Sequence, residues 1–520
     1  MRTFLETVIF TLTRVYFFLI NVAFSLINAF SPLVVVPSTS ASLLLLSARQ
    51  AAAAIQITSV DLIEAYIQRI IEVNPLVNAV CEEGFDDARR RAKELDLLVA
   101  KATAAVLEEL AICHPLLGVP FTVKECLAVA GFRQTSGVVK NKDNIAAKDA
   151  VVVQRMKEAG AICLATTNVP ELCAAGETVN ALYGKTSNPY DTRRSTAGSS
   201  GGEGALIGAA ASLVGIGTDI MGSIRAPAAA CGVYGLMPSP GLSSMIGYFR
   251  HDLVPPPRRE KILRSGPLCR YAEDLSLLLK AMSDGKAKVD EPISSLRIFY
   301  LEGIDSLLNE YTSKRMEGVV TRAVNFLERK YATTVVEVKL PLAAFTQEMF
   351  AAEFYMPGQP TIAQTVADEP INELLELIRG LFLGNSLHSP PTMMKSLLQK
   401  YSAMNETNVI KPLLRLEYLQ KQVKELLGKD GILLSPTMQD IAFFHNKNVF
   451  APMNNSYTAL FNILFLPSLH CPLGLDPDSS LPVGVQVSGP ANSDGRLIAI
   501  ANDLEAEFGG WQQPKKSYLA

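Results

Sequence analysis

The chain has 520 residues, with 48 Lys and Arg against 51 Asp and Glu and a formal net charge of −3. This near balance indicates no nucleic acid or other polyanion as a partner. The eight cysteines and five histidines have no Cys-x-x-Cys or His-x-x-x-His spacing, so the sequence indicates no metal site, no dense disulfide framework and no cofactor. Only 19% of the residues are charged and the mean hydropathy is +0.20, which directs attention to a lipid or a membrane.

An uncharged apolar stretch, residues 15–36, lies near the N-terminus and is closed by Pro37. At about 1.5 Å per residue, a helix of this length crosses a hydrocarbon core of about 30 Å. We therefore expect residues 1–37 to be a single-pass membrane anchor. A cleaved signal peptide, or a helix inserted from one side and broken at Ser31-Pro32, are the alternatives.

Charges and sequons suggest how such an anchor would be oriented. Arg2 and Arg14 precede the apolar stretch, which favours a cytosolic N-terminus and a lumenal catalytic domain. Asn405 and Asn454 each begin a glycosylation sequon, which suits a lumenal face. The endoplasmic reticulum and lipid droplets are the expected membranes.

Helix and strand patterns alternate over the next part of the chain. Thr58, followed three residues later by Asp61, predicts the start of a helix that ends at Asn74-Pro75. The other predicted helices are 43–56, 84–109, 151–159 and 204–212, and the predicted strands are 118–125, 161–166 and 213–216. This alternation predicts an α/β fold, in which helices cover a sheet.

The pattern becomes less regular between about residues 285 and 440. Strands are predicted at 296–301 and 334–340, and helices at 313–331, 371–383 and 391–427. The apolar faces of these helices fit either an ordinary core or an acyl-chain tunnel with a membrane-facing cap. Residues 457–490 return to strand and turn patterns that would complete the sheet. We expect one catalytic domain over residues 45–515.

Two serine sites stand out between Ser195 and Arg225. Ser199-Ser200 and Ser223 each lie beside glycines, whose backbone lets several N–H groups converge on one point. Convergent donors beside a serine indicate acyl transfer. A flexible Gly-Ser linker and a phosphate-binding loop are the alternatives, but the GxxxxGK[ST] pattern of the latter is absent.

A serine nucleophile needs a base. Residues 198–202 match the GxSxG pattern of a nucleophile elbow, but the turn-like stretch 187–191 leaves no strand leading into it. No histidine lies near either serine site in the sequence. Lys124, at the end of the apolar strand 118–125, is the other candidate, because a lysine held away from water can lose its proton.

Several blocks of sequence together resemble a known family. GVPFTVKE, SNPYD, GSSGGEGAL and GTDIMGSIRAPAAACGVYG are similar to the amidase signature family of Ser-Ser-Lys hydrolases. SGPLCRYAEDL, YTALFNILFLPSLHCPLGL and LPVGVQVSGP resemble more narrowly the fatty-acid amide hydrolase type 2 group. The resemblance covers about residues 45–515. It implies the amidase-signature fold, a large twisted mixed sheet with helices on both faces, here preceded by a transmembrane helix.

The resemblance also implies site residues. Ser223 would be the acyl-enzyme nucleophile, Lys124 the general base and acid, and Ser199, preceded by a cis peptide bond, the proton bridge between them. Ser200 would support this network through hydrogen bonds. The remaining implied groups surround the second serine: an oxyanion hole made of the backbone N–H groups of Ile220, Met221, Gly222 and Ser223, with Asp219 and Arg225 bracing the loop.

Met221 and Ala197 stand where the family usually has glycine. If position 221 needs a positive φ, a methionine there would strain the loop. The expected function is a membrane-anchored serine amidase that converts fatty-acid primary amides or N-acylethanolamides to a fatty acid and ammonia or an amine. An amidase for small or aromatic amides, or a catalytically weakened protein that binds lipid amides, are the alternatives. The expected partners are the lipid amide, the membrane and, by resemblance, a second copy in a homodimer.

Overall fold

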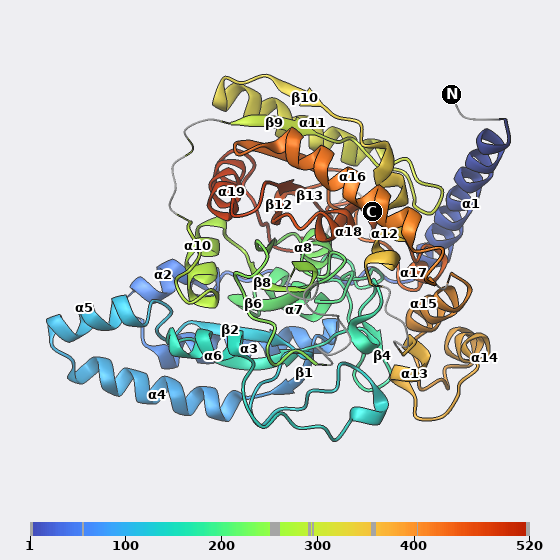
Figure 1. Cartoon of the computed structure of the whole chain (residues 1–520). Coiled ribbons are helices and arrows are strands. Elements are labelled where there is room, and N and C mark those ends of the chain that lie inside the picture. Colours follow the sequence, from blue (N-terminus) through green and yellow to red (C-terminus); the bar gives the residue numbers. More distant parts are fainter. Residues whose placement is uncertain are drawn as a thin grey trace.

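The structure is a computed structural model of the chain that describes residues 4–54, 57–249, 261–289, 293, 296–354, 360–402 and 404–515. Within these residues the strands form an 11-stranded sheet and a two-stranded ribbon (Figure 1). The order across the large sheet is β1 (Val80–Glu83), β3 (Ile162–Thr167), β2 (Pro120–Lys124), β6 (Val214–Asp219), β8 (Arg264–Cys269), β7 (Tyr234–Met237), β12 (Ser468–Leu475), β13 (Pro482–Ser488), β11 (Gly431–Pro436), β9 (Arg297–Tyr300) and β10 (Val335–Glu337). The ribbon pairs β4 (Val179–Asn180) with β5 (Gly184–Lys185).

The large sheet is mixed. Strands β3, β2 and β6 run parallel to one another, as do β11, β9 and β10, and the remaining neighbours are antiparallel. The parallel groups follow from helices between the strands, because a parallel connection needs a crossover. The sheet therefore combines two parallel blocks joined by antiparallel strands.

The α-helices of the described residues lie between and around these strands. They are α1 (Phe4–Ala29), α2 (Ala48–Ala53), α3 (Ser59–Val77), α4 (Phe85–Lys101), α5 (Ala104–Cys113), α6 (Val151–Glu158), α7 (Gly201–Gly208), α8 (Arg225–Cys231), α10 (Ala272–Met282), α11 (Lys314–Tyr331), α12 (Thr346–Glu353), α13 (Ile362–Val366), α14 (Glu373–Ile378), α15 (Pro390–Tyr401), α16 (Ile410–Leu427), α17 (Lys447–Phe450), α18 (Ser456–Ile463) and α19 (Asp494–Phe508).

Buried apolar side chains form clusters on both faces of the sheet. Successive residues of a strand point to opposite faces. Leu236 and Ile298 belong to one cluster, with residues of α3, α10, α11 and α19, whereas their neighbours Met237 and Phe299 belong to another, with residues of α12, α16 and α18. Helices thus cover both faces, and the predicted α/β architecture is confirmed.

Several predicted boundaries differ from the structure. Thr58 caps α3 as expected, accepting a hydrogen bond from the Asp61 N–H at 3.0 Å. The helix continues through Pro75 and ends at Asn78, which adopts the left-handed conformation with φ of 50°. The predicted helix 84–109 is two helices, α4 and α5, and 43–54 contains a 3₁₀ turn followed by α2, while Ile55 and Gln56 lie outside the described residues.

The apolar N-terminal helix is shifted toward the N-terminus. Helix α1 ends at Ala29, and its candidate membrane span is Thr7–Ala29, with 6% of the most apolar window buried. Pro32 has no N–H to continue a helix. The following residues pack against the rest of the chain, where the Val36 N–H donates to the Pro189 carbonyl at 2.9 Å and Val36 is 1% exposed. The predicted span 15–36 was therefore wrong at its C-terminal end.

The segment from about 285 to 440 divides into two parts. Its strands β9 and β10 and helix α11 extend the central sheet and its core. Helices α13, α14 and α15 instead lie at the edge of the molecule, near α17 and on the same side as α1 (Figure 1).

Candidate active site

Lys124 is the last residue of β2 and is fully buried. Strand β2 is buried at every position because it lies between β3 and β6. The Nζ atom donates hydrogen bonds to Ser199 Oγ at 2.7 Å, to Thr218 Oγ1 at 2.8 Å and to the Thr218 carbonyl at 3.2 Å. Within the described part of the chain, no carboxylate lies within ion-pair distance of Lys124 Nζ. Its hydrogen-bond partners are hydroxyl and carbonyl oxygens.

Ser199 lies in the loop that leads into α7 and is 1% exposed. The Gly198–Ser199 peptide bond is cis, as the resemblance implied. Gly198 has no room for a side chain, because a Cβ atom would stand 2.9 Å from the Ala175 carbonyl oxygen. Ala197 adopts a left-handed φ of 55°, and its carbonyl accepts a hydrogen bond from Thr178 Oγ1 at 2.8 Å. The loop therefore accommodates alanine at position 197.

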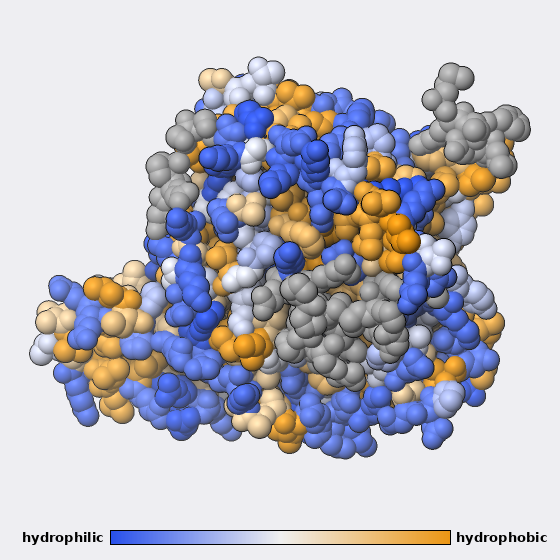
Figure 2. All heavy atoms as spheres, viewed as in Figure 1, coloured by the Kyte–Doolittle hydropathy of each residue, from blue (hydrophilic) through white to orange (hydrophobic). Residues whose placement is uncertain are grey.

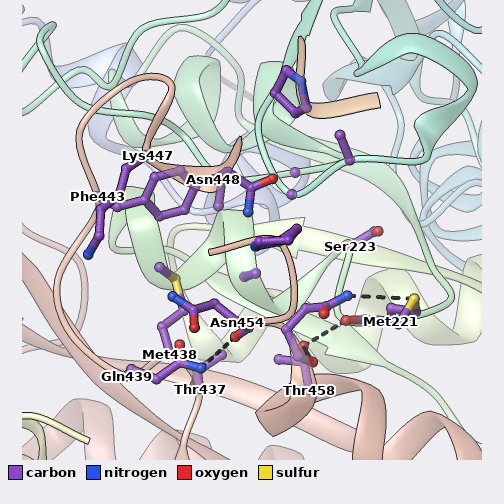
Figure 3. Close-up of a pocket in the computed structure, with 18 of the residues that line it drawn as sticks. Met221, Ser223, Thr437, Met438, Gln439, Phe443, Lys447, Asn448, Asn454 and Thr458 are labelled. Carbon is purple, nitrogen blue, oxygen red and sulfur yellow. Dashed lines mark hydrogen bonds between the residues drawn. The ribbon is translucent and has the colours of Figure 1, made fainter. Parts of the chain in front are cut away.

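A backbone hydrogen bond joins the two serine loops. The Ser200 N–H donates to the Ser223 carbonyl at 3.1 Å, and Ser200 Oγ donates to the Thr218 carbonyl at 3.5 Å. Ser199 and Ser200 are buried, whereas Ser223 is 8% exposed and lines a pocket. Ser223 is thus the serine of the three that faces open space (Figure 3).

Asp219 and Arg225 close the base of the second serine loop. Both are fully buried, and Arg225 Nη2 lies 3.0 Å from Asp219 Oδ1. Burial alone would raise the pKa of Asp219, but the charge of Arg225, together with hydrogen bonds from Arg225, Asn462 and the Ile224 N–H, lowers this pKa to about 2. The ionised Asp219 accepts hydrogen bonds from the Gly222 and Ile224 N–H groups and from Arg225.

The positive φ in this loop belongs to Gly222, not to Met221. Gly222 has φ of 111°, and a Cβ atom there would stand 2.0 Å from Thr458 Oγ1. Thr458 Oγ1 donates to the Met221 carbonyl at 2.7 Å, so the glycine lets a neighbouring helix approach. Met221 is absent from the left-handed region. The strain expected at position 221 was therefore wrong, because its neighbour makes the turn.

The four expected oxyanion donors are not equivalent. The Gly222 N–H already donates to Asp219 Oδ1 at 2.7 Å. By contrast, the backbone N–H groups of Ile220, Met221 and Ser223 have no acceptor among the described residues. This differs from the expectation for Gly222, because the carboxylate that braces the loop uses its donor.

The pocket in front of Ser223 has about 920 Å³ of space not filled by atoms, part of it open to solvent. Its walls come from distant parts of the chain and include apolar and polar side chains. The lining residues include Cys173, Ile220, Met221, Pro391, Lys395, Met438, Gln439, Phe443, Lys447, Asn448, Asn454 and Asn455. Figure 3 shows Met221 and Thr458 on one side of this space and Phe443 and Lys447 on the other.

Sequence reasoning missed some polar residues of the site. Thr218, next to Asp219 at the end of β6, gives Lys124 two of its three oxygen partners. Glu203 accepts hydrogen bonds from Thr122 Oγ1 at 2.6 Å and Thr167 Oγ1 at 2.7 Å, and burial raises its pKa to about 8. A glutamate in the Gly- and Ala-rich stretch after Ser200 was the signal available for it.

Metal-binding geometry is not found in the described ranges, where no group of three or more His, Cys, Asp or Glu residues could hold an ion. The five histidines lie apart from the serines in the sequence. His445, the one near the pocket-lining Lys447, has its ring Nδ1 2.7 Å from Glu177 Oε1. Among the described residues, the groups that contact the serine network are Lys124, Thr218, the Cys173 thiol and backbone groups.

Known proteins resemble this chain over most of its length. The Amidase family model matches residues 61–498. Fatty-acid amide hydrolase 2-A of Danio rerio is 37% identical over 504 residues, which cover 93% of this chain and 92% of that protein. Fatty-acid amide hydrolase 2 of Homo sapiens is 36% identical over 493 residues, 91% of each. A solved structure of fatty acid amide hydrolase has a TM-score of 0.71 at 23% identity, covering 90% of this chain and 86% of that one.

Proposed function

The chain belongs to the amidase family of amide-hydrolysing enzymes, and from this premise we propose that it is a serine hydrolase of fatty-acid amides in which Ser223, Ser199 and Lys124 act together. The observation that carries the proposal is the 2.7 Å hydrogen bond between Lys124 Nζ and Ser199 Oγ, buried behind the pocket-facing Ser223. No carboxylate neutralises this lysine in the described ranges, so it can exchange a proton with a hydroxyl.

In the first step Ser223 Oγ attacks the amide carbonyl carbon. Its proton passes to Ser199 Oγ, while Ser199 gives its own proton to Lys124 Nζ. The negative charge that develops on the carbonyl oxygen is stabilised by the unused N–H groups of Ile220, Met221 and Ser223. Each such donor typically contributes about 10²- to 10³-fold in rate.

In the second step the carbon–nitrogen bond breaks. An amine leaves poorly unless it is protonated as it departs, so Lys124 returns the proton through Ser199 to the leaving nitrogen. The acyl group stays on Ser223 as an ester. Water then attacks this ester, with the same two residues taking its proton, and the fatty acid is released.

The loop geometry supports an active enzyme over the weakened binding protein. Met221 keeps an ordinary φ, and Gly222 occupies the position that requires a positive one. Buried contacts of Asp219 and Arg225 hold the loop in place. Three backbone donors therefore have no acceptor among the described residues and are available to the reaction.

Lipid amides are supported as substrates by the relatives named fatty-acid amide hydrolase 2. Burying an acyl chain contributes about 0.8 kcal/mol per methylene, so kcat/KM should rise with chain length. A second candidate, an amidase of small amides, is favoured by the polar side chains of Gln439, Asn448 and Asn455 on the pocket wall. Comparing kcat/KM for oleamide, octanamide and benzamide decides between them, since a value independent of chain length would exclude a lipid tunnel.

Membrane attachment through α1 is part of the proposal. Its outer face exposes large apolar side chains such as Phe18 and Ile27, 65% and 66% exposed, and Figure 2 shows apolar residues along this helix. Its other side contacts the catalytic region, where Tyr16 Oη donates to the Phe450 carbonyl at 2.8 Å and Asn21 Nδ2 donates to Glu310 Oε1 at 2.7 Å. These contacts favour a helix held against the domain rather than a free anchor.

The side of the membrane can be read from glycosylation in cells. Asn405 is exposed, whereas Asn454 donates to Glu310 and lies on the pocket wall. A lumenal domain predicts a glycan that Asn405→Gln removes and Asn454→Gln does not. Absence of any glycan in endoplasmic-reticulum fractions, together with protease cleavage of the domain in sealed microsomes, would indicate a cytosolic domain.

The test of catalysis uses full-length protein in detergent. Wild type should hydrolyse oleamide and react with a fluorophosphonate probe, and Ser223→Ala should abolish both. A folded wild type that neither turns over any of the three amides nor reacts with the probe would overturn the proposal.

A further inference from the structure

A second lysine faces the same pocket as Ser223. Lys395 lies on α15, one helical turn after Pro391, and residues four apart share one face of a helix. Both residues line the pocket in front of Ser223. The Lys395 side chain therefore reaches the substrate space from the helical edge of the molecule rather than from the sheet.

The ammonium group of Lys395 makes few polar contacts with the described part of the protein. Among the described residues its one polar contact is Met221 Sδ at 3.7 Å, and a thioether is a weak acceptor. Asn455 Nδ2 donates to the same sulfur at 3.5 Å. No carboxylate of the described ranges lies within ion-pair distance of Lys395.

Acidic side chains on the neighbouring elements are all engaged elsewhere. Glu171 lies 2.7 Å from His388 Nδ1 and accepts from the Ser389 N–H at 3.0 Å. On α14, the two acids pair with other cations: Glu373 with Lys400 at 3.5 Å, and Glu376 with Arg379 at 2.7 Å. None of them is left to neutralise Lys395.

The other charges on the pocket wall are balanced within the protein. Lys447 Nζ lies 2.8 Å from Glu310 Oε1, and Glu310 also accepts from Asn21 and Asn454. Asp440 lies 3.0 Å from Arg315 Nη1. Lys395 is thus the pocket charge without a counter-ion in the described ranges.

A buried charge without a partner is unfavourable, and a ligand that supplies the opposite charge removes this cost. Part of the Lys395 side chain faces the pocket space, yet burial lowers its pKa to about 8, so most of it is still protonated at neutral pH. The pocket therefore presents a positive charge near the oxyanion loop.

We propose that Lys395 is a specificity-determining residue that recognises a carboxylate on the amine half of the substrate and so sets the preference of the enzyme between anionic and neutral fatty-acid amides. The proposal rests on the proposed amidase function. In that function the acyl half is a hydrocarbon chain, so the amine half is the part that can carry an anion. Water adds across the amide, the carbon–nitrogen bond breaks, and the products are a fatty acid and the free amino acid.

The test compares two substrates of similar size with full-length enzyme at pH 7: N-oleoylglycine, which is anionic, and N-oleoylethanolamine, which is neutral. The measured quantity is the ratio of kcat/KM for the anionic to the neutral amide. Lys395→Met keeps the length of the side chain without its charge, and we expect it to lower this ratio at least tenfold, mainly through KM. Lys395→Arg should retain the ratio.

Lys400→Met is the matched control, because it makes the same change on the same helix away from the pocket lining. It should leave the ratio at its wild-type value. An equal effect of Lys395→Met on both substrates would overturn the inference. So would a change confined to inhibition by oleate, which would assign Lys395 to the carboxylate of the product.

Failure of the proposed function is distinguishable from failure of this inference. A wild type that hydrolyses the neutral amide, with a ratio insensitive to Lys395, contradicts only the inference. If no amide is hydrolysed, the binding of the two amides to the Ser223→Ala protein still tests the inference about Lys395. N-oleoylglycine should then bind at least tenfold more weakly after Lys395→Met, and N-oleoylethanolamine should not; equal binding overturns the inference.

Discussion

Two lysines lie near Ser223, and they belong to regions built in different ways. Lys124 ends a fully buried parallel strand and makes three short hydrogen bonds to oxygen atoms. Lys395 lies on a helix at the edge of the molecule, with one long contact to a sulfur atom. The strand fixes its lysine against the serine network, whereas the helix presents its lysine to whatever enters the pocket.

From this difference we assign catalysis to the region around Lys124 and substrate recognition to the region around Lys395. The loops that follow β2 and β6 are held by the central sheet, which can aim reacting groups with little freedom. The edge helices α13 to α15 contribute fewer buried contacts to the sheet and can vary without disturbing it. We expect changes in the first region to remove turnover, and changes in the second to alter which amide is preferred.

The largest expected effect is the loss of Lys124. Lys124→Met should lower oleamide turnover by about 10⁴-fold, because the proton transfers of both steps pass through this residue. The loss of oleamide turnover caused by Lys395→Met should be at least a hundred times smaller than the loss caused by Lys124→Met. Equal losses of turnover in the two variants, with matching circular dichroism spectra, would show that catalysis and substrate recognition are not separated between the two regions.

Gly222 should come next. Gly222→Ala adds a Cβ atom 2.0 Å from Thr458 Oγ1 at a φ of 111°, so the oxyanion loop must move. A drop of about 10²- to 10³-fold in kcat is expected, the size of one lost donor. Gly241→Ala is the control, since Gly241 also has a positive φ, 81°, but an added Cβ would meet nothing within 4 Å. A comparable loss in the control would attribute the effect to backbone strain alone.

The preference for the anionic over the neutral amide should depend on pH by about tenfold, because it depends on the charge of Lys395 in the second region. The pKa of Lys395 is lowered to about 8, so its charge is present below pH 8 and is lost as the pH rises through that value. Between pH 7 and pH 9 the charged fraction falls from about nine-tenths to about one-tenth. The preference for N-oleoylglycine over N-oleoylethanolamine should fall accordingly in wild type and persist in Lys395→Arg. Taking the ratio cancels the shared pH dependence of Ser223 chemistry.

The smallest effect belongs to Met221, where the two regions meet. Its sulfur accepts from Lys395 and from Asn455, both weak contacts. Met221→Leu should lower kcat/KM for both substrates by about twofold to fivefold, because the backbone N–H and its conformation are retained. A loss above a hundredfold in steady-state assays would contradict the ordinary backbone conformation found at this position.

Much of the fold could be predicted because the helix and strand patterns are local. The cap at Thr58 and the strand ending at Lys124 depend on residues a few positions apart, and both were found as expected. Boundaries failed where tertiary packing overrides the local pattern. Pro75 remained inside α3, and the N-terminal helix ended at Ala29, so that Val36 lies outside it and donates a hydrogen bond to the Pro189 carbonyl.

The sequence by itself determined which residues could react. Ser199, Ser223 and Lys124 stand in sequence blocks whose glycines and apolar neighbours indicate their environment, and Asp219 and Arg225 flank the second serine loop. The family likewise follows from these blocks.

Only the tertiary structure decided how those groups are used. Whether the Gly222 N–H is free depends on the orientation of the Asp219 carboxylate, and the positive φ at Gly222 depends on the approach of Thr458. Lys395, in a segment with no motif, becomes part of the site only because α15 lies across the pocket from a loop far away in the chain. Charge balance in a pocket is a sum over residues distant in sequence, and no local pattern contains it.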